Sequence, residues 1–105
     1  MISIKGLDKA EVLAALVNGT RALGFGSFHD KGRFTADDAR AFVERGTNDM
    51  GFRMGEARWR FDYVAGRPLK CDLSGDEFDE RLYDRDAGDG AAERALAALR
   101  AQVSP

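Results

Sequence analysis

The sequence predicts an α+β fold in which a small antiparallel sheet packs against about three α-helices. Residues 58–73, RWRFDYVAGRPLKCDL, alternate apolar and charged residues on both sides of Ala65-Gly66, which is typical of a β-hairpin. The segments before and after it repeat apolar residues at helical spacing instead. A chain of 105 residues, 44% of them apolar, has the size of one domain with its own core. We therefore expect a single globular domain over residues 1–105.

The N-terminal segment predicts a strand followed by a helix. Ile2 and Ile4 alternate with polar residues, so we expect a short strand that joins the hairpin as the third member of the sheet. Asp8, followed three residues later by Glu11, forms a capping-box pattern that marks the start of a helix. Apolar residues then recur at the helical period, and Gly24 supplies the stop after about four turns.

A second helix is predicted in the middle of the chain. The glycine-rich loop 24–33 leads to a second capping pattern, formed by Thr35 and Asp38. This pattern predicts a short helix that ends at Gly46. Residues 47–57 show no clear period, and we expect them to connect this helix to the hairpin.

Residues 74–90 form an acidic connector. Its acids are Asp76, Glu77, Asp79, Glu80, Asp84, Asp86 and Asp89. Phe78, Leu82 and Tyr83 interrupt them at a spacing that allows a helical turn packed on the core. The alanine-rich sequence that begins near Gly90 predicts a last amphipathic helix.

The register of the hairpin depends on the length of its loop. A two-residue loop, 65–66, would place Phe61 opposite Lys70, and the parity of the apolar pattern argues against it. A three-residue loop, 64–66, places Phe61 opposite Leu69 and puts glycine at the left-handed bulge position that such loops need. We therefore expect the three-residue loop.

A shifted three-residue loop, 65–67, is the alternative. It would pair Arg60 with Asp72 and Asp62 with Lys70, whereas the preferred loop leaves Arg60 facing Lys70. Exposed pairs of this kind contribute less than about 1 kcal/mol each. We therefore expect turn geometry to decide the register.

Composition argues against several classes of protein. The chain has 16 basic and 18 acidic residues and a pI of about 5.4, so broad nucleic-acid binding is not expected. A single cysteine rules out an internal disulfide and fits a reducing cytosol. Met1–Lys5 lacks the apolar core of a signal peptide, and no window reaches the length of a membrane span. We therefore expect a cytoplasmic protein that does not associate with membranes.

Two groups of residues partly resemble known metal-binding or catalytic sites, but neither completes such a site. Acids alternate over 84–90 as at the start of an EF-hand loop, but its sixth position is Asp89 instead of glycine and its twelfth is Ala95 instead of glutamate. His29 and Cys71 are single residues, and Cys71 falls at an apolar-face position where a core thiol is expected. The sequence therefore assigns no catalytic residue, metal ligand or cofactor and favours a protein that is not an enzyme.

Charge is distributed unevenly around the hairpin. Basic residues gather on it and acids follow it, which predicts a docking surface with a positive and a negative edge; alternatively, each charge run is only the solvated face of its element. The candidate partner-binding residues are Arg58, Arg60, Arg67, Lys70, Asp76, Asp84 and Asp86. Trp59, Phe61 and Tyr63 recur at period two, and we expect them to face the core instead of stacking on nucleic-acid bases.

Several motifs resemble those of a family of short bacterial proteins that phages and prophages also encode. They are the opening LDKAEVL, the FDY, GR, K and DLS of the hairpin, and the later LYDRD and GAAE. The resemblance supplies no activity, cofactor or functional residue for this chain. It implies an association with phages, and through that association it favours a small inhibitor of a host system.

These observations predict a small cytosolic protein–protein interaction module. The resemblance suggests a phage-derived inhibitor of a host system, such as an anti-CRISPR-like anti-defence protein. The alternative is a small enzyme or ligand-binding protein with an acidic pocket around Asp84 and Asp86, beside the 24–33 loop and its His29. A homodimer that pairs hairpin edges is a further possibility.

Overall fold

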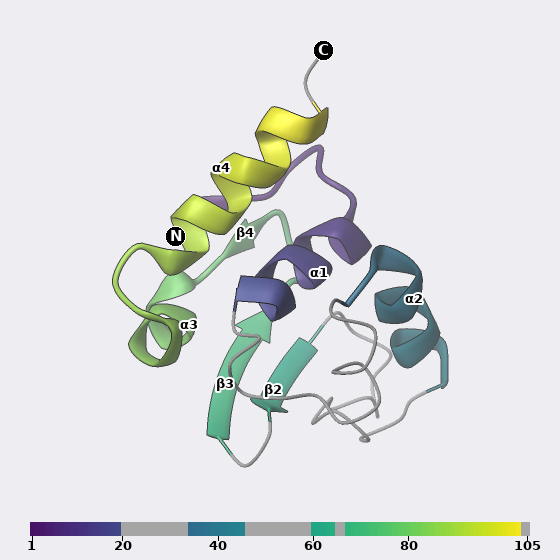
Figure 1. The fold of residues 1–105 in the computed structure, drawn as a ribbon, viewed down its shortest axis with the longest axis horizontal. Helices are drawn as coiled ribbons and strands as arrows, with labels where there is room; N and C mark the ends of the chain where they lie inside the picture. Colours follow the sequence, from purple (N-terminus) through teal and green to yellow (C-terminus); the bar gives the residue numbers. More distant parts are fainter. Residues whose placement is uncertain (20–33, 46–59, 65–66, 104–105) are drawn as a thin grey trace.

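The computed structural model describes residues 1–19, 34–45, 60–64 and 67–103, and only the backbone at 42–45, 60–64, 67–71, 86 and 103. In chain order the elements are β1 (Ile2–Ser3), α1 (Lys9–Gly19), α2 (Ala36–Arg45), β2 (Arg60–Val64), β3 (Arg67–Asp72), β4 (Glu77–Phe78), α3 (Glu80–Ala87) and α4 (Ala91–Val103). This confirms the predicted α+β class. Figure 1 shows α1 between α4 and the β2–β3 pair, with α2 beside it. In the described part of the chain, no helix is long and apolar enough to cross a membrane.

The strands form two separate antiparallel pairs, β1 with β4 and β2 with β3. The prediction that the N-terminal strand joins the hairpin is therefore wrong. Ile2 lies opposite Phe78, and the Ile4 backbone N–H donates to the Asp76 carbonyl at 2.7 Å. This pairing buries both Ile4 and Phe78 in the core, which the hydrophobic effect favours.

The β2–β3 pair changes register along its length. The paired positions are Arg60–Asp72, Phe61–Cys71, Tyr63–Pro68 and Val64–Arg67. Between Phe61 and Tyr63 the single residue Asp62 therefore stands opposite two residues of β3, Leu69 and Lys70, as in a β-bulge. The preferred register, with Phe61 opposite Leu69, is wrong. The parity argument assumed one register for the whole strand, and the bulge removes that assumption.

The pairing of β2 with β3 combines the two registers that were not preferred. Val64 lies opposite Arg67, as a two-residue loop would place them. Arg60 lies opposite Asp72, as the shifted loop would place them. Residues 65–66, and Arg58 and Trp59 before β2, lie outside the described residues.

The buried core lies around α1. Apolar residues of α1, α2, α3, α4, β4 and the segments beside them are buried together: Ile4, Ala10, Val12, Leu13, Ala14, Leu16, Val17, Phe34, Ala39, Leu73, Phe78, Tyr83, Ala92, Leu96 and Leu99. α1 packs against α2 on one side and α4 on another. It is therefore buried over most of its circumference, and few of its positions reach the surface.

The two helix starts predicted from capping patterns are confirmed. The Asp8 carboxylate accepts from the Ala10 backbone N–H at 3.0 Å. At the start of α2, Thr35 Oγ1 accepts from the Asp38 N–H at 3.1 Å, and Asp38 Oδ2 accepts from the Thr35 N–H at 2.9 Å. This reciprocal pair satisfies two backbone donors that the first turn of a helix leaves without partners. The predicted helix ends at Gly24 and Gly46 lie outside the described residues.

The last third of the chain holds more regular structure than the predicted connector. β4 and α3 both fall inside the acidic segment, and α4 follows as predicted. Asp79 is the N-cap of α3, where its side chain accepts from the Arg81 N–H. Gly88 and Gly90, between α3 and α4, have φ angles of 112° and 74°, a region that favours glycine.

Candidate functional site

The predicted basic residues lie on one pair of strands. Arg60 is in β2, and Arg67 and Lys70 are in β3. Because the strands are antiparallel and bulged, Arg60 lies opposite Asp72 at one end of the pair and Arg67 opposite Val64 at the other. Arg58 lies outside the described residues. The structure thus brings three of the four basic candidates onto one two-stranded unit.

The acidic candidates lie on other segments than these basic residues. Asp76 is exposed beside β4, and its carbonyl accepts from the Ile4 N–H. Asp84 and Asp86 lie in α3, and Asp86 is described by its backbone alone. The acidic candidates are therefore divided between the segment before β4 and α3.

Asp84 joins α3 to the start of α4. Its Oδ1 accepts from the Ala92 N–H at 2.9 Å and its Oδ2 from the Gly90 N–H at 3.3 Å. Its backbone carbonyl accepts from the Gly88 N–H at 2.7 Å. Both carboxylate oxygens therefore serve backbone donors at the first turn of α4. In this structure Asp84 is a helix-capping residue.

Replacing Asp84 with alanine is expected to lower the free energy of unfolding by about 1–2 kcal/mol, because the Gly90 and Ala92 N–H groups at the start of α4 lose their acceptor. Urea unfolding followed by circular dichroism measures the change. The matched control is Asp89→Ala, because Asp89 is an exposed acid of the same connector. Equal stability of the Asp84 and Asp89 variants would show that the cap does not stabilise the fold.

Two further acids of the connector are also held by neighbouring groups. Asp79 makes an ion pair with Arg81 at 2.7 Å, and hydrogen bonds from the Arg81 side chain and backbone lower the pKa of Asp79 to about 2. Because the folded-state pKa is depressed, the stabilisation is present above the ordinary Asp pKa. It is lost as the pH falls through about 2.

Glu80 lies against the start of the chain. Its Oε2 is 3.1 Å from the Met1 ammonium nitrogen. The Glu80 backbone N–H, and after it this ammonium, lower the pKa of the Glu80 carboxyl through hydrogen bonding. Asp79, Glu80 and Asp84 are therefore all engaged within the fold.

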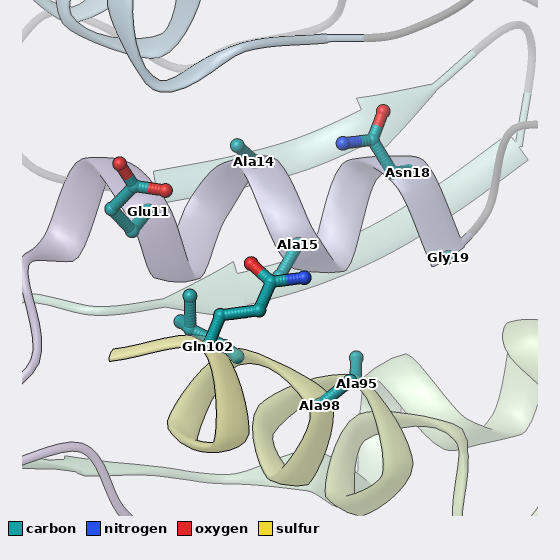
Figure 2. Close-up of a pocket in the computed structure, with 9 residues that line it drawn as sticks. Glu11, Ala14, Ala15, Asn18, Gly19, Ala95, Ala98 and Gln102 are labelled. Carbon is teal, nitrogen blue, oxygen red and sulfur yellow. The ribbon is translucent and has the colours of Figure 1, made fainter. Parts of the chain in front are cut away.

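An open groove lies between α1 and α4. It has a volume of about 330 Å³ and is lined by Glu11, Ala14, Ala15, Asn18, Gly19, Ala95, Ala98, Leu99 and Gln102. Figure 2 shows Glu11 and Gln102 toward one end, and Asn18 and Gly19 toward the other. Asn18 is held in place by the Phe34 backbone, since its amide donates to the Phe34 carbonyl at 2.9 Å and accepts from the Phe34 N–H at 2.8 Å.

Sequence reasoning missed this groove. The available signal was the clustering of small residues at positions of both helices that line the groove, Ala14, Ala15 and Gly19 on α1 and Ala95 and Ala98 on α4. Small side chains leave space between packed helices. That pattern indicates a groove only once α1 and α4 are known to be neighbours.

The remaining chemical candidates can be placed only in part. Cys71 is in β3, opposite Phe61, whereas His29 and the 24–33 loop lie outside the described residues. Among the residues that the structure describes, no three His, Cys, Asp or Glu side chains are grouped so that they could hold a metal ion.

Comparison of the chain with protein-family models, with curated proteins and with solved structures found no match in any of the three.

Proposed function

We propose that this protein is a small protein–protein interaction module that binds its partner through the β2–β3 pair. The observation that supports this most is the position of Arg60, Arg67 and Lys70 on a two-stranded unit. In the described part of the chain, β2 and β3 pair only with each other. Each strand therefore has a second edge that no other described strand occupies, and partners that add a strand to a sheet bind at such edges.

The acids are weaker candidates for the binding surface than the basic residues. Asp79, Glu80 and Asp84 each have a partner within the fold. Of the acidic candidates, Asp76 is exposed. A partner of the β2–β3 pair would accordingly present an acidic surface to the basic residues, because complementary charge steers association and sets specificity.

The nature of that partner rests on sequence resemblance. The motifs shared with short bacterial and phage-encoded proteins favour a host component that a phage-derived inhibitor blocks, for instance in an anti-defence role. The alternative, a small enzyme or ligand-binding protein with an acidic pocket around Asp84, is less well supported. Both oxygens of Asp84 already accept from the α4 backbone.

Two double variants with the same change in net charge test the proposal. We expect Arg60→Glu/Arg67→Glu to lose the partner that the wild type captures from a lysate of its bacterial host. We expect Lys5→Glu/Lys9→Glu to retain it. Lys5 lies between β1 and α1, and Lys9 is the first residue of α1. Quantitative mass spectrometry compares the captured proteins, and circular dichroism shows that both variants are folded.

Three outcomes are informative. Loss of the partner in the strand variant alone supports binding through β2–β3. Retention of the partner in both variants, or loss in both, contradicts this surface. Failure of the wild type to enrich any protein contradicts the interaction module itself.

A further inference from the structure

The outward face of α4 is lined with alanine. Ala92, Leu96 and Leu99 are buried against the core, whereas Ala97, Ala98 and Ala101 are exposed. Ala91, Arg94, Ala98 and Ala101 follow one another at intervals of three, four and three residues. This is the a/d spacing of a helix that packs along another helix. Alanine at such positions lets two helix backbones approach closely.

The groove continues this face onto α1. Ala98 lines the groove and is also part of the outward face of α4. α1 and α4 run antiparallel along the groove, so that Glu11 of α1 lies at the level of Gln102 of α4 (Figure 2). A helix laid along α4 would therefore pass Glu11 near the C-terminal end of α4.

Two opposite charges flank this surface. Glu11 is exposed and makes no ion pair within the described residues. Arg94 is also exposed, and its Nη1 donates to a backbone carbonyl, that of Asp89, at 2.9 Å. Glu11 lies near one end of α4 and Arg94 near the other, so the surface presents one acidic and one basic side chain at opposite ends. Such a surface is complementary to itself after a half-turn rotation.

We infer that the α1–α4 groove is the interface of a symmetric dimer, in which its occupant is α4 of a second copy of this chain. With the two α4 helices antiparallel and crossing near Ala98, Arg94 of one copy lies over Gln102 of the other. There it is within reach of Glu11 of that copy. The two-fold axis repeats the contact, so that the dimer gains two Glu11–Arg94 pairs around an alanine-lined centre.

The dimer is expected to be weak. α4 has 13 residues, which corresponds to a contact about 20 Å long, and its central residues are small. Interfaces of this size belong to the low end of stable assemblies. Self-association is therefore expected in the micromolar to millimolar range and is to be measured over that range with purified protein alone.

Sedimentation equilibrium of the wild type and five variants tests the interface. Ala98→Glu, which places a charge at the crossing point, is expected to give a monomer. Glu11→Arg and Arg94→Glu are each expected to weaken self-association about tenfold, because each creates two like-charge contacts. The double variant Glu11→Arg/Arg94→Glu restores the charge pairs and is expected to recover most of the wild-type affinity. Glu93→Arg is the matched control, because Glu93 is exposed on α4 but lies outside the a/d positions.

The results separate this dimer from other assemblies. A wild type that stays monomeric to about 1 mM overturns the inference. So does a dimer that Ala98→Glu leaves intact, which would point to pairing elsewhere, for example at the strand edges. A dimer in which the double variant fails to recover overturns the antiparallel arrangement. None of these results depends on the partner proposed for β2–β3. If the groove instead binds a helix of a different protein, the purified wild type stays monomeric.

Discussion

Replacing Tyr83 with alanine is expected to lower the free energy of unfolding by about 3–5 kcal/mol, the usual cost of removing a buried aromatic ring. Tyr83 is fully buried. Its ring meets Phe78 edge to face, with the centroids 6.4 Å apart, and its hydroxyl donates to the Leu16 carbonyl at 2.8 Å. Tyr83 therefore ties α3 to both β4 and the C-terminal turn of α1. Urea unfolding followed by circular dichroism measures the loss.

The neighbouring residue supplies a matched control. Leu82 is in the same helix and 39% exposed, so Leu82→Ala is expected to change the free energy of unfolding by no more than about 0.5 kcal/mol. If both variants lose the same amount, the cost reflects the helix and not the buried ring. A loss at Tyr83 of less than about 1 kcal/mol would contradict its place in the core.

Gly19→Ala is expected to cost about 1–3 kcal/mol in the wild type, although alanine is the better helix former. A Cβ atom at Gly19 would lie 2.5 Å from the Tyr83 hydroxyl oxygen, but 3.8 Å from the ring carbon that carries it. The conflict is thus with one oxygen atom. That oxygen belongs to a fully buried ring, so it has little room to move.

The Tyr83→Phe background tests this geometry. Removing the hydroxyl costs about 0.5–1.5 kcal/mol through the lost hydrogen bond to Leu16. In that background, Gly19→Ala leaves an ordinary contact and is expected to be neutral or slightly stabilising. The free energies of unfolding of the four proteins form a double-mutant cycle with a favourable coupling of at least about 1 kcal/mol. Additive effects would show that the side chain at position 19 does not meet Tyr83.

Helix starts could be predicted from the sequence because their partners are close along the chain. Thr35 and Asp38 are three residues apart and satisfy each other's backbone N–H groups. Asp8 and Ala10 are two apart. Contacts of this range depend on a few dihedral angles, so the pattern of residue types is enough to identify them.

Pairing between distant segments could not be predicted in the same way. The partner of β1 is a two-residue strand, Glu77–Phe78, inside an acidic segment, and two residues are too few to show a period. In β2–β3 the apolar alternation was correct evidence for strands, but a bulge opposite Asp62 shifts the register. The alternation of apolar and polar residues within one strand does not indicate whether its partner strand contains an extra, bulged residue.

In the candidate site, too, contacts between distant segments could not be predicted from the sequence. Asp84 was predicted to bind a partner or ligand because acids alternate around it. Its carboxylate instead accepts hydrogen bonds from the N–H groups of Gly90 and Ala92. The sequence does not show this capping role, because it depends on how α3 meets the start of α4. The groove could not be predicted from the sequence either, because its two walls, α1 and α4, are separated by most of the chain.

The closeness of the first and last elements has a consequence for the order of folding during synthesis. β1 pairs with β4, and the Arg100 guanidinium donates to the Ser3 carbonyl, 97 positions away. The high contact order of this region means that α1 can form early and pack against α2, but its apolar face toward α4 stays exposed until α4 has left the ribosome. The nascent chain therefore carries an exposed apolar face on α1 until α4 has been made. A chaperone that binds such segments would meet this protein at α1 before it could fold.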